Sequence, residues 1–280
     1  MPMKTVRTVE AVRQHSRNTK QTGLKVGLVP TMGGLHEGHL SLVRKARELS
    51  DIVIVSLFVN PKQFNNPDDL ETYPGDEKTD IAALEEIGVD VVFIPSVEEM
   101  YPEAFSTQVI VSAAGNILCD AHRPGHFEGV ATVVAKLFLQ VEPDFACFGE
   151  KDFQQLFIIR SLVRDLNIPV EIIPVETVRE SDGLAMSSRN ARLSKRERQI
   201  AAQLQAKMKE VADKIKSGSN PSDVSKDART TLEADGNFSV EYLEYRSGET
   251  LKLLDHHDPA GRLFAAAWLG DVRLIDNLAV

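Results

Sequence analysis

The sequence predicts an α/β protein in which a doubly wound parallel sheet is followed by a smaller α+β domain. Apolar, β-branched segments alternate with helical patterns through the first two-thirds of the chain, as in parallel α/β domains. Residues 51–59 form a near-continuous apolar run, which is typical of a parallel strand buried on both faces. Near residue 178 the order changes to helices followed by strands. We therefore expect two domains, 1–178 and 179–280.

The first domain is expected to contain five strands that alternate with helices. The expected strands are 24–29, 51–59, 89–94, 144–148 and 170–173, the last ending before Pro174. The expected helices are 39–49, 76–87, 129–141 and 152–166. Ligands of such sheets bind at the carboxyl ends of the strands. Three polar loops fall there, namely 30–39, 60–64 and 149–152, and together they predict a binding site.

The second domain begins with a polar, glycine-containing loop at 180–190. Ser194 and Glu197 form the pattern of a capping box, which predicts a helix that runs to about residue 216. Asn220 and Pro221 fit the N-cap and first position of another helix, which ends near Gly236. Strands are expected at 238–245, 262–268 and 272–275, so this domain is of the α+β type.

The composition is that of an ordinary globular protein, with 42% hydrophobic and 26% charged residues among 280. Cys119 and Cys147 show no C-x-x-C spacing, which favours a reducing compartment. The N-terminus lacks an apolar core of signal-peptide length, and no apolar run approaches the ~20 residues that span a bilayer. We expect a cytoplasmic protein without membrane contact.

The formal net charge of −9 argues against a nucleic-acid partner, which usually requires a broad basic surface. Lysine and arginine are scattered, apart from a local concentration at 189–198. A small anionic substrate can still bind where a few basic groups converge. The charge balance therefore favours an enzyme that acts on metabolites.

The most informative segment is 29–39, Val-Pro-Thr-Met-Gly-Gly-Leu-His-Glu-Gly-His, at an expected strand-to-helix turn. Free backbone N–H groups and the helix dipole make such turns favourable for anions. His36 and His39 are three residues apart and share a face of the first helical turn. A phosphate bound there would meet two imidazoles and several amides, so the segment indicates nucleotide chemistry.

Generic motifs do not explain this segment. The glycine spacing of a P-loop is present, but His39 and Leu40 follow where that motif has Lys and Ser or Thr. The two histidines are spaced i, i+3, whereas zinc proteases need i, i+4. The dinucleotide pattern G-x-G-x-x-G is absent as well. Taken alone, the glycines are equally well explained by tight turn geometry.

Six segments in this order resemble the pantoate–β-alanine ligase family, which is related to class I aminoacyl-tRNA synthetases and nucleotidylyltransferases. They are VPTMGGLHEGH (29–39), FVNPKQF (58–64), RPGHFEGV (123–130), CFGEKDFQQL (147–156), DGLAMSSRN (182–190) and AAWLGDVRLIDN (266–277). The resemblance covers nearly the whole chain and implies a Rossmann-like fold. It also implies a reaction in which the pantoate carboxylate attacks the α-phosphate of ATP, and β-alanine then attacks the resulting acyl adenylate.

The resemblance implies roles for individual residues. His36, His39 and Lys151 are expected to be catalytic, with His39 as proton donor. ATP is expected to contact Met32, Gly33, Gly34, Leu35, His36, Glu37, Gly38, His39, Gly149, Glu150, Lys151, Asp152, Val178, Met186, Ser187, Ser188 and Arg189. Val178 would contact adenine through its backbone, and Asp152 the ribose hydroxyls. Pantoate and β-alanine are expected to contact Gln63, Gln155, Asn60 and Arg123.

Read without the resemblance, several of these residues have plainer interpretations. Gln155 is then a surface helix residue, Arg123 an ordinary loop arginine and Asp152 a helix N-terminal acid, and His36 and His39 are capping or structural histidines. Two positions depart from the family pattern. Gly34 stands where Ala or Asn is common, which loosens the turn, and Lys62 stands where Met is common, which adds a charge beside the pocket.

Further expectations concern metal, motion and assembly. Mg²⁺ is expected with ATP, held through phosphates and water rather than by a protein metal site. Residues 65–75 are expected to form a mobile flap over pantoate, and the second domain to close over ATP through the Met-Ser-Ser-Arg loop. A homodimer is implied by the resemblance alone. Two alternatives stay open: a nucleotidylyltransferase of the same superfamily, and a tRNA-binding module, which the net charge disfavours.

Overall fold

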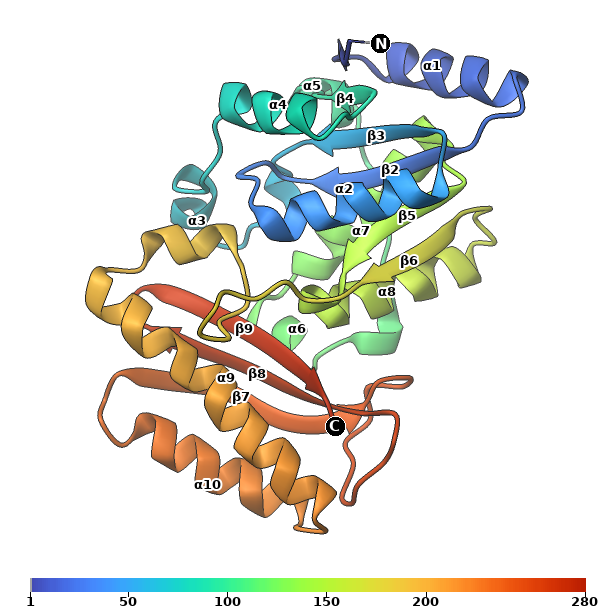
Figure 1. Cartoon of the computed structure of the whole chain (residues 1–280). Helices are drawn as coiled ribbons and strands as arrows, with labels where there is room; N and C mark the ends of the chain where they lie inside the picture. The colour runs from blue at the N-terminus through green and yellow to red at the C-terminus, as the bar shows by residue number, and fades with distance from the viewer. Residues whose placement is uncertain (1) are drawn as a thin grey trace. The chain divides into compact units, whose positions relative to one another are not determined.

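A computed structural model describes residues 2–280 of the chain (Figure 1). The chain divides into two compact units. The first consists of Met1–Glu150 and Gln154–Glu176, and the second of Lys151–Phe153 and Thr177–Val280. A short segment that follows a strand of the first unit therefore belongs to the second. Each unit has its own sheet and its own core.

The first unit is built on a six-stranded sheet, which is wholly parallel as the sequence predicted and has one strand more than the five expected. Its strand order is β1-β4-β3-β2-β5-β6. The strands are β1 (Lys4–Val6), β2 (Val26–Thr31), β3 (Ile52–Leu57), β4 (Val91–Phe93), β5 (Phe145–Gly149) and β6 (Glu171–Val175). The order runs outward in both directions from the β2–β5 pair, which makes that pair the switch point where such sheets bind ligands.

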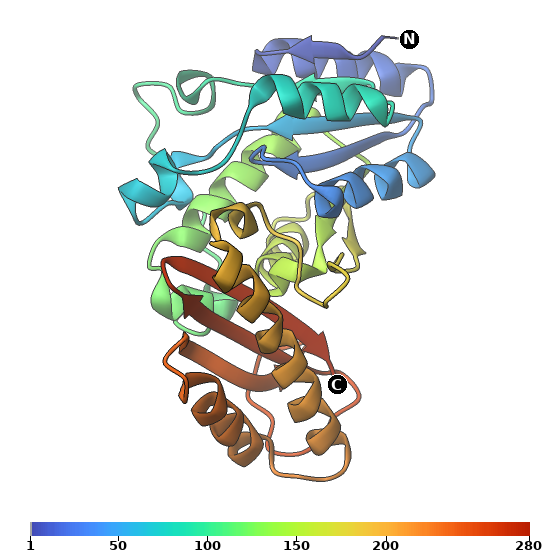
Figure 2. The ribbon, with the colours of Figure 1, turned by 60° about the vertical axis from the view of Figure 1, so that its left-hand side comes forward.

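Helices cover both faces of this sheet, with α2 on one face and α7 on the other (Figures 1 and 2). The helices are α1 (Val9–Gln21), α2 (Glu37–Leu49), α3 (Pro67–Glu71), α4 (Glu77–Glu86), α5 (Val97–Met100), α6 (Cys119–His122), α7 (His126–Val141) and α8 (Phe153–Asp165). The 3-10 turns are η1 (Pro61–Gln63), η2 (Ser112–Ala114) and η3 (Glu150–Asp152). The apolar sequence of α7 is explained by burial on nearly every side.

Two details of the first sheet differ from the sequence prediction. β6 does not end before Pro174 but continues through it, with Pro174 paired to Phe148 and Val175 to Gly149. The proline is accommodated because β6 is the edge strand. The strand β1 and the 13-residue helix α1 were not predicted; β1 has only three residues, which leave almost no periodic signal.

The second unit is an antiparallel sheet, ordered β7-β8-β9, with two helices packed against it (Figure 2). Its elements are η4 (Ser188–Arg192), α9 (Lys195–Lys216), α10 (Pro221–Glu233), β7 (Phe238–Ser247), β8 (Gly261–Leu269) and β9 (Val272–Ala279). Ser194 and Glu197 form the predicted capping box, and Asn220 caps α10 with Pro221 in its first turn. The predicted α+β character is therefore confirmed.

Cys119 and Cys147 are free thiols and both are buried. Burial raises the pKa of the Cys147 thiol to about 12, so this side chain behaves as a small apolar group. Across residues 2–280 the helices are too short or too polar to cross a membrane.

Candidate active site

The junction of β2 and α2, at the carboxyl end of a central strand, places His36 just before α2 and His39 in its first turn. His36 is the N-cap residue of α2, and its Nδ1 accepts a hydrogen bond from the Gly38 N–H at 3.1 Å. The His39 Nδ1 accepts from the His36 N–H at 3.3 Å. The pair is thus a reciprocal capping box made of imidazoles, with ring centroids 4.1 Å apart.

These contacts determine which nitrogen of each ring carries the proton. Because both Nδ1 atoms accept hydrogen bonds from backbone N–H groups, each neutral ring has its proton on Nε2. His36 and His39 therefore present two Nε2–H donors at the positive end of a helix dipole. An anion is the chemical partner that this arrangement favours.

Asp80, which the sequence did not single out, holds the turn before these histidines. Its side chain comes from α4, and its two oxygens accept from the Gly34 N–H at 2.9 Å and the Leu35 N–H at 2.8 Å. Asp80 is only 5% exposed, and a Cβ on Gly33 would lie 2.8 Å from its Oδ2. Two of the amides expected to face a phosphate are thus already bonded to a carboxylate. In this turn, the imidazoles of His36 and His39 are therefore the main groups that could donate to a phosphate.

Gly33 and Gly34 have φ angles of 82° and 63°, a conformation that glycine adopts readily. The departure of Gly34 from the family pattern therefore agrees with the backbone found there. Glu37, in the first turn of α2, forms an ion pair with Arg44 across two helical turns. Arg44 lowers the pKa of Glu37 through that hydrogen bond, so Glu37 remains charged beside the turn.

The loop after β3 places the Gln63 side chain in a buried hydrogen-bond network. Gln63 is 8% exposed; its Oε1 accepts from Asn60 Nδ2 at 3.0 Å, and its Nε2 lies 3.0 Å from the Met32 Sδ. Asn60 is 1% exposed and also donates to the Gly129 carbonyl at 3.1 Å. Its Oδ1 accepts from the Tyr101 hydroxyl at 2.8 Å. Both amide hydrogens of Asn60 are used within the protein, so its geometry suits it to orienting Gln63.

Tyr101 was not predicted from sequence, because nothing local links it to Asn60 across 41 residues. Burial raises the pKa of its hydroxyl, which keeps it a neutral donor. The Lys62 ammonium lies 5.1 Å from the centroid of the Tyr101 ring and 5.3 Å from that of Phe105. The extra charge at this family-variable position is therefore engaged with two aromatic rings.

Arg123 lies beside the main chain of the same loop. Its Nη1 is 3.2 Å from His126 Nε2, and His126 Nδ1 is 2.8 Å from the Gln63 carbonyl oxygen. Because that carbonyl can only accept, the His126 proton is on Nδ1 and its Nε2 accepts from Arg123. His126 thereby links Arg123 to Gln63, a relay that turn-like sequence alone does not reveal.

The two adjacent glutamines of α8 have different surroundings. Gln154 is 5% exposed; it accepts from the Cys119 N–H and donates to the Ile117 carbonyl, each at 2.9 Å. Gln155 is partly exposed at the start of the helix. Gln154 thus serves the fold, and Gln155 is the one of the pair that a ligand can reach.

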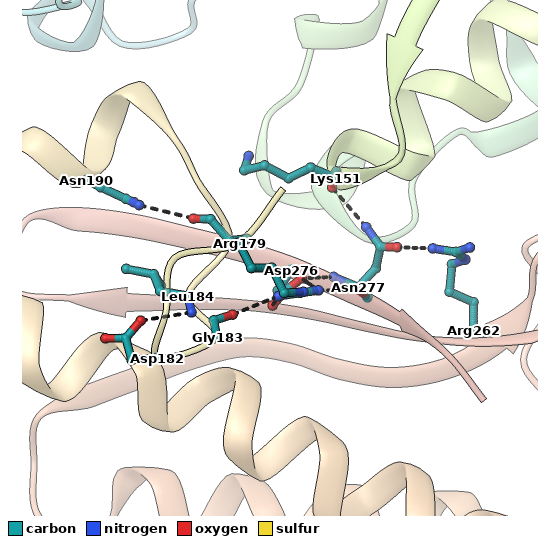
Figure 3. Close-up of polar contacts among 10 residues, drawn as sticks. Lys151, Arg179, Asp182, Gly183, Leu184, Asn190, Arg262, Asp276 and Asn277 are labelled. Atoms are coloured by element: carbon teal, nitrogen blue, oxygen red, sulfur yellow. Dashed lines mark hydrogen bonds and ion pairs between the residues drawn. The ribbon is translucent and has the colours of Figure 1, made fainter. Parts of the chain in front are cut away.

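In the second unit, Lys151 and Asp152 belong to the segment 151–153, which packs on the sheet β7-β8-β9 (Figure 3). The Lys151 side chain is 19% exposed, and its Nζ lies 3.7 Å from Asp152 Oδ1. The Lys151 carbonyl accepts from Asn277 Nδ2 at 2.9 Å. The main chain that carries this cation is thus bonded to a side chain of β9.

The chain from Val178 to Met186 forms a tight hairpin. The Met186 N–H donates to the Val178 carbonyl at 3.0 Å. On α9, Arg198 binds two acidic residues of the hairpin, Glu180 and Asp182, each at 2.6 Å. Hydrogen bonding to Arg198 lowers the pKa of Asp182 and so keeps this carboxylate ionised. The hairpin is therefore fixed to α9 by two ion pairs.

The hairpin leads directly into the serine-rich segment. The Ser187 hydroxyl accepts from the Arg189 N–H at 3.3 Å and so caps the turn η4, which contains Ser188 and Arg189. Asn190 Nδ2 donates to the Ala185 carbonyl at 3.0 Å, which folds the segment back on its own hairpin. Two hydroxyls and a guanidinium are thereby gathered in one short turn.

Within residues 2–280, no cluster of three or more His, Cys, Asp or Glu side chains is arranged to hold a metal ion. The donor sets described above consist instead of imidazole N–H groups, amides, hydroxyls and cations, which bind anions. The predicted site residues thus form two groups, one in each unit, and each group suits phosphate or carboxylate ligands.

The chain is similar to a well-defined set of known proteins. The model of the family described as pantoate-beta-alanine ligase matches residues 4–279. The pantothenate synthetase of Roseobacter denitrificans is 50% identical over 280 residues, which cover 100% of this chain and 99% of that protein. A crystal structure of that enzyme from Thermus thermophilus matches with a TM-score of 0.92 at 45% identity, over 99% of both chains. The ligase of Francisella tularensis, complexed with beta-gamma ATP and beta-alanine, has a TM-score of 0.81 at 36% identity, over 99% of this chain and 97% of that one.

Proposed function

The chain belongs to the pantoate–β-alanine ligase family, and on that premise we propose how its residues join pantoate to β-alanine with consumption of ATP. The pantoate carboxylate attacks the α-phosphate of ATP and releases pyrophosphate. The β-alanine amine then attacks the acyl carbon of pantoyl adenylate and releases AMP. The observation that carries the proposal is the imidazole capping box, which presents two Nε2–H donors at the end of β2.

The main physical difficulty of the first step is charge, because a carboxylate must approach a polyphosphate. His36 and His39 donate to phosphate oxygens from a fixed tautomer, and His39 acts as the proton donor. Lys151 supplies a compact positive charge, and Ser187, Ser188 and Arg189 bind the departing pyrophosphate. Met32 to His39, Gly149 to Asp152, Val178 and Met186 to Arg189 form the ATP-binding set, in which Asp152 accepts from ribose and Val178 contacts adenine.

Pantoate offers two hydroxyls and a carboxylate, and these suit side-chain amides that both donate and accept. We assign Gln155 to pantoate and Gln63 to pantoate and β-alanine. The contacts of Asn60 and Arg123 support roles beside Gln63: Asn60 orients the Gln63 amide, and Arg123 contributes a cation near its main chain. The pocket thereby extends beyond the phosphate site, as a ligase requires and a nucleotidylyltransferase does not.

Mg²⁺ would enter with ATP, bound by phosphate oxygens and water. The donor chemistry of the described residues supports this assignment, because it offers anion-binding groups rather than a carboxylate cage. When bound, the ion neutralises phosphate charge, and the histidines and Lys151 orient the phosphates.

We also propose a domain arrangement and an assembly. Residues 1–178 bind nucleotide and pantoate, and residues 179–280 form a lid domain whose Met-Ser-Ser-Arg loop acts as a hinge. Residues 65–75 form a flap over pantoate. We further propose a cytoplasmic homodimer; two buried free thiols are consistent with a reducing compartment.

The test is a coupled assay for AMP and pyrophosphate with ATP, Mg²⁺ and pantoate, with and without β-alanine. Sustained AMP release that needs both pantoate and β-alanine, and that is lost in His39→Ala, is the expected result. Turnover that ignores β-alanine, or a nucleotidylated product in place of free AMP, would instead favour a nucleotidylyltransferase.

A further inference from the structure

Two adjacent residues of β9, Asp276 and Asn277, contact two different parts of the proposed ATP-binding set. Asn277 is 4% exposed, and its Nδ2 donates to the Lys151 carbonyl at 2.9 Å while its Oδ1 accepts from Arg262. Asp276 is 6% exposed and accepts from both terminal nitrogens of Arg179, at 2.6 and 2.9 Å. Arg179 also donates to the Gly183 carbonyl at 3.0 Å, across the hairpin. A continuous chain of contacts therefore connects Lys151 with the hairpin (Figure 3).

Asp276 and Asn277 are neighbours on one strand, which explains how they contact two different segments, 151–153 and the hairpin 178–186. Successive side chains of a strand point to opposite faces of its sheet. Asn277 is paired with Phe264, whose ring packs 5.8 Å from that of Phe153, so the segment 151–153 lies on this face. Asp276 is paired with Ala265, which belongs to the core that α9 forms on the other face. The strand thus separates the two segments and holds each by one side chain.

The strand β9 keeps the side chains of Asp276 and Asn277 in fixed positions. β9 is paired with β8 without interruption from Val272 to Ala279, so neither side chain can shift along the strand. The Asp276 Oδ1 also accepts from the Asn277 N–H at 2.7 Å, which fixes the carboxylate relative to its neighbour. Arg179, which is half-buried, and the buried Asp276 form a two-pronged ion pair, the geometry that an arginine fork makes best.

We propose that Asp276, Asn277 and Arg179 are positioning residues for the adenylation step. They hold the main chain of Lys151 in a fixed relation to the hairpin that leads into Met186–Arg189. This inference rests on the proposed roles of Lys151 and of residues 186–189 toward ATP. A displacement of about 1 Å at a reacting group lowers catalysis by about a hundredfold, so small changes in this chain of contacts have large kinetic effects.

Two substitutions of nearly unchanged size test the proposal. Asn277→Asp keeps the acceptor for Arg262 but cannot donate to the Lys151 carbonyl, and Arg179→Lys keeps the charge but loses the fork. Arg246→Lys is the matched control, because Arg246 is 7% exposed and likewise binds one carboxylate, Glu244, and one loop carbonyl, Leu251. Its contacts lie elsewhere in the second unit. Thermal unfolding, kcat and KM for ATP and for β-alanine, and the ATP-induced shift in the unfolding midpoint are measured for each.

The expected result is a loss in kcat/KM for ATP of about tenfold or more in Asn277→Asp and Arg179→Lys, with KM for β-alanine within about twofold of wild type. Arg246→Lys should lose comparable stability and keep wild-type kinetics. Wild-type kcat/KM for ATP in both test variants, or equal losses in all three, would overturn the proposal. If one test variant does not fold, Asp276→Asn takes its place.

Failure of the proposed function is distinguishable, because it would appear as inactivity of the wild type with pantoate and β-alanine. In that case the ATP-induced shift in the unfolding midpoint tests the positioning role. Loss of this shift in Asn277→Asp and Arg179→Lys, but not in Arg246→Lys, supports the role. An unchanged shift in the two test variants refutes it.

Discussion

Gly129→Ala is expected to disable pantoate use while leaving the fold intact. Gly129 lies near the start of α7, where the helix rests on the main chain of the Asn60–Gln63 loop. A Cβ at this position would lie 2.3 Å from the Lys62 carbonyl oxygen, 2.5 Å from its carbon and 2.7 Å from the Gln63 nitrogen. All three are backbone atoms, so no side-chain rotation relieves the overlap.

The size of the effect follows from these distances. Ordinary contacts of this kind are about 3.5 Å or longer, so helix and loop must separate by about 1 Å. The hydrogen bond of 3.1 Å from Asn60 to the Gly129 carbonyl would then be lost, and with it the restraint on Gln63. Overpacking lowers the free energy of unfolding by about 1–3 kcal/mol, and replacing Gly by Ala within a helix raises it by about 1 kcal/mol. With about 1 kcal/mol for the lost buried hydrogen bond, the net loss of stability is about 1–3 kcal/mol, which is too small to unfold a typical domain.

Catalysis should suffer far more than stability. A shift of about 1 Å at Gln63 predicts a loss of about a hundredfold in kcat/KM for pantoate, with KM for ATP little changed. The assay is steady-state AMP release with pantoate varied at saturating ATP and β-alanine, alongside urea unfolding. Gly115→Ala is the control, because the nearest atom to its Cβ is 3.4 Å away. Wild-type pantoate kinetics in Gly129→Ala would refute the reasoning.

Two other predictions concern the buried Asp80 carboxylate and the half-buried His15 imidazole. In Asp80→Asn, the amide NH₂ would face one of the two loop N–H groups, so one hydrogen bond is lost. The free energy of unfolding should fall by about 1–3 kcal/mol, and KM for ATP should rise. A KM for ATP equal to that of the wild type would contradict the role assigned to Asp80. Burial, with a smaller contribution from Lys4, lowers the pKa of His15 below 6.5 in the folded state. The unfolded chain then binds more protons between that pKa and about 6.5, so stability should rise with pH through this interval and be complete above it. His15→Gln should flatten that rise in urea unfolding measured from about pH 5 to 7.5, and an unaltered slope would exclude His15 as its source.

Features that depend on contacts between residues close in the sequence were predicted correctly. The capping pair Ser194 and Glu197 and the start of α10 at Asn220 depend on contacts three residues or fewer apart. The parallel sheet followed from the length and continuity of apolar runs. The binding loops could be located because parallel strands end at one edge.

Residues whose role depends on distant contacts were missed. Asp80 looks like any acid in the first turn of an exposed helix, and its contacts are with Gly34 and Leu35, 46 and 45 residues earlier. Asn277 lies in one of the six family-like segments, and its partner Lys151 is 126 residues away. The sequence predicts a strand end before Pro174, because the edge position that tolerates a proline is a property of the whole sheet.

By itself the sequence determined the fold class, the family and the chemistry, because periodicity, capping and motif spacing are local and add up along the chain. The tertiary structure alone decided which nitrogen of each active-site imidazole donates, that Gln154 bonds to the main chain near Cys119, and which side chains hold Gln63 and Lys151. These facts depend on hydrogen bonds whose geometry only the folded chain defines, most of them between segments far apart in the sequence. No pattern within a segment encodes a distant partner, so only the folded arrangement could reveal it.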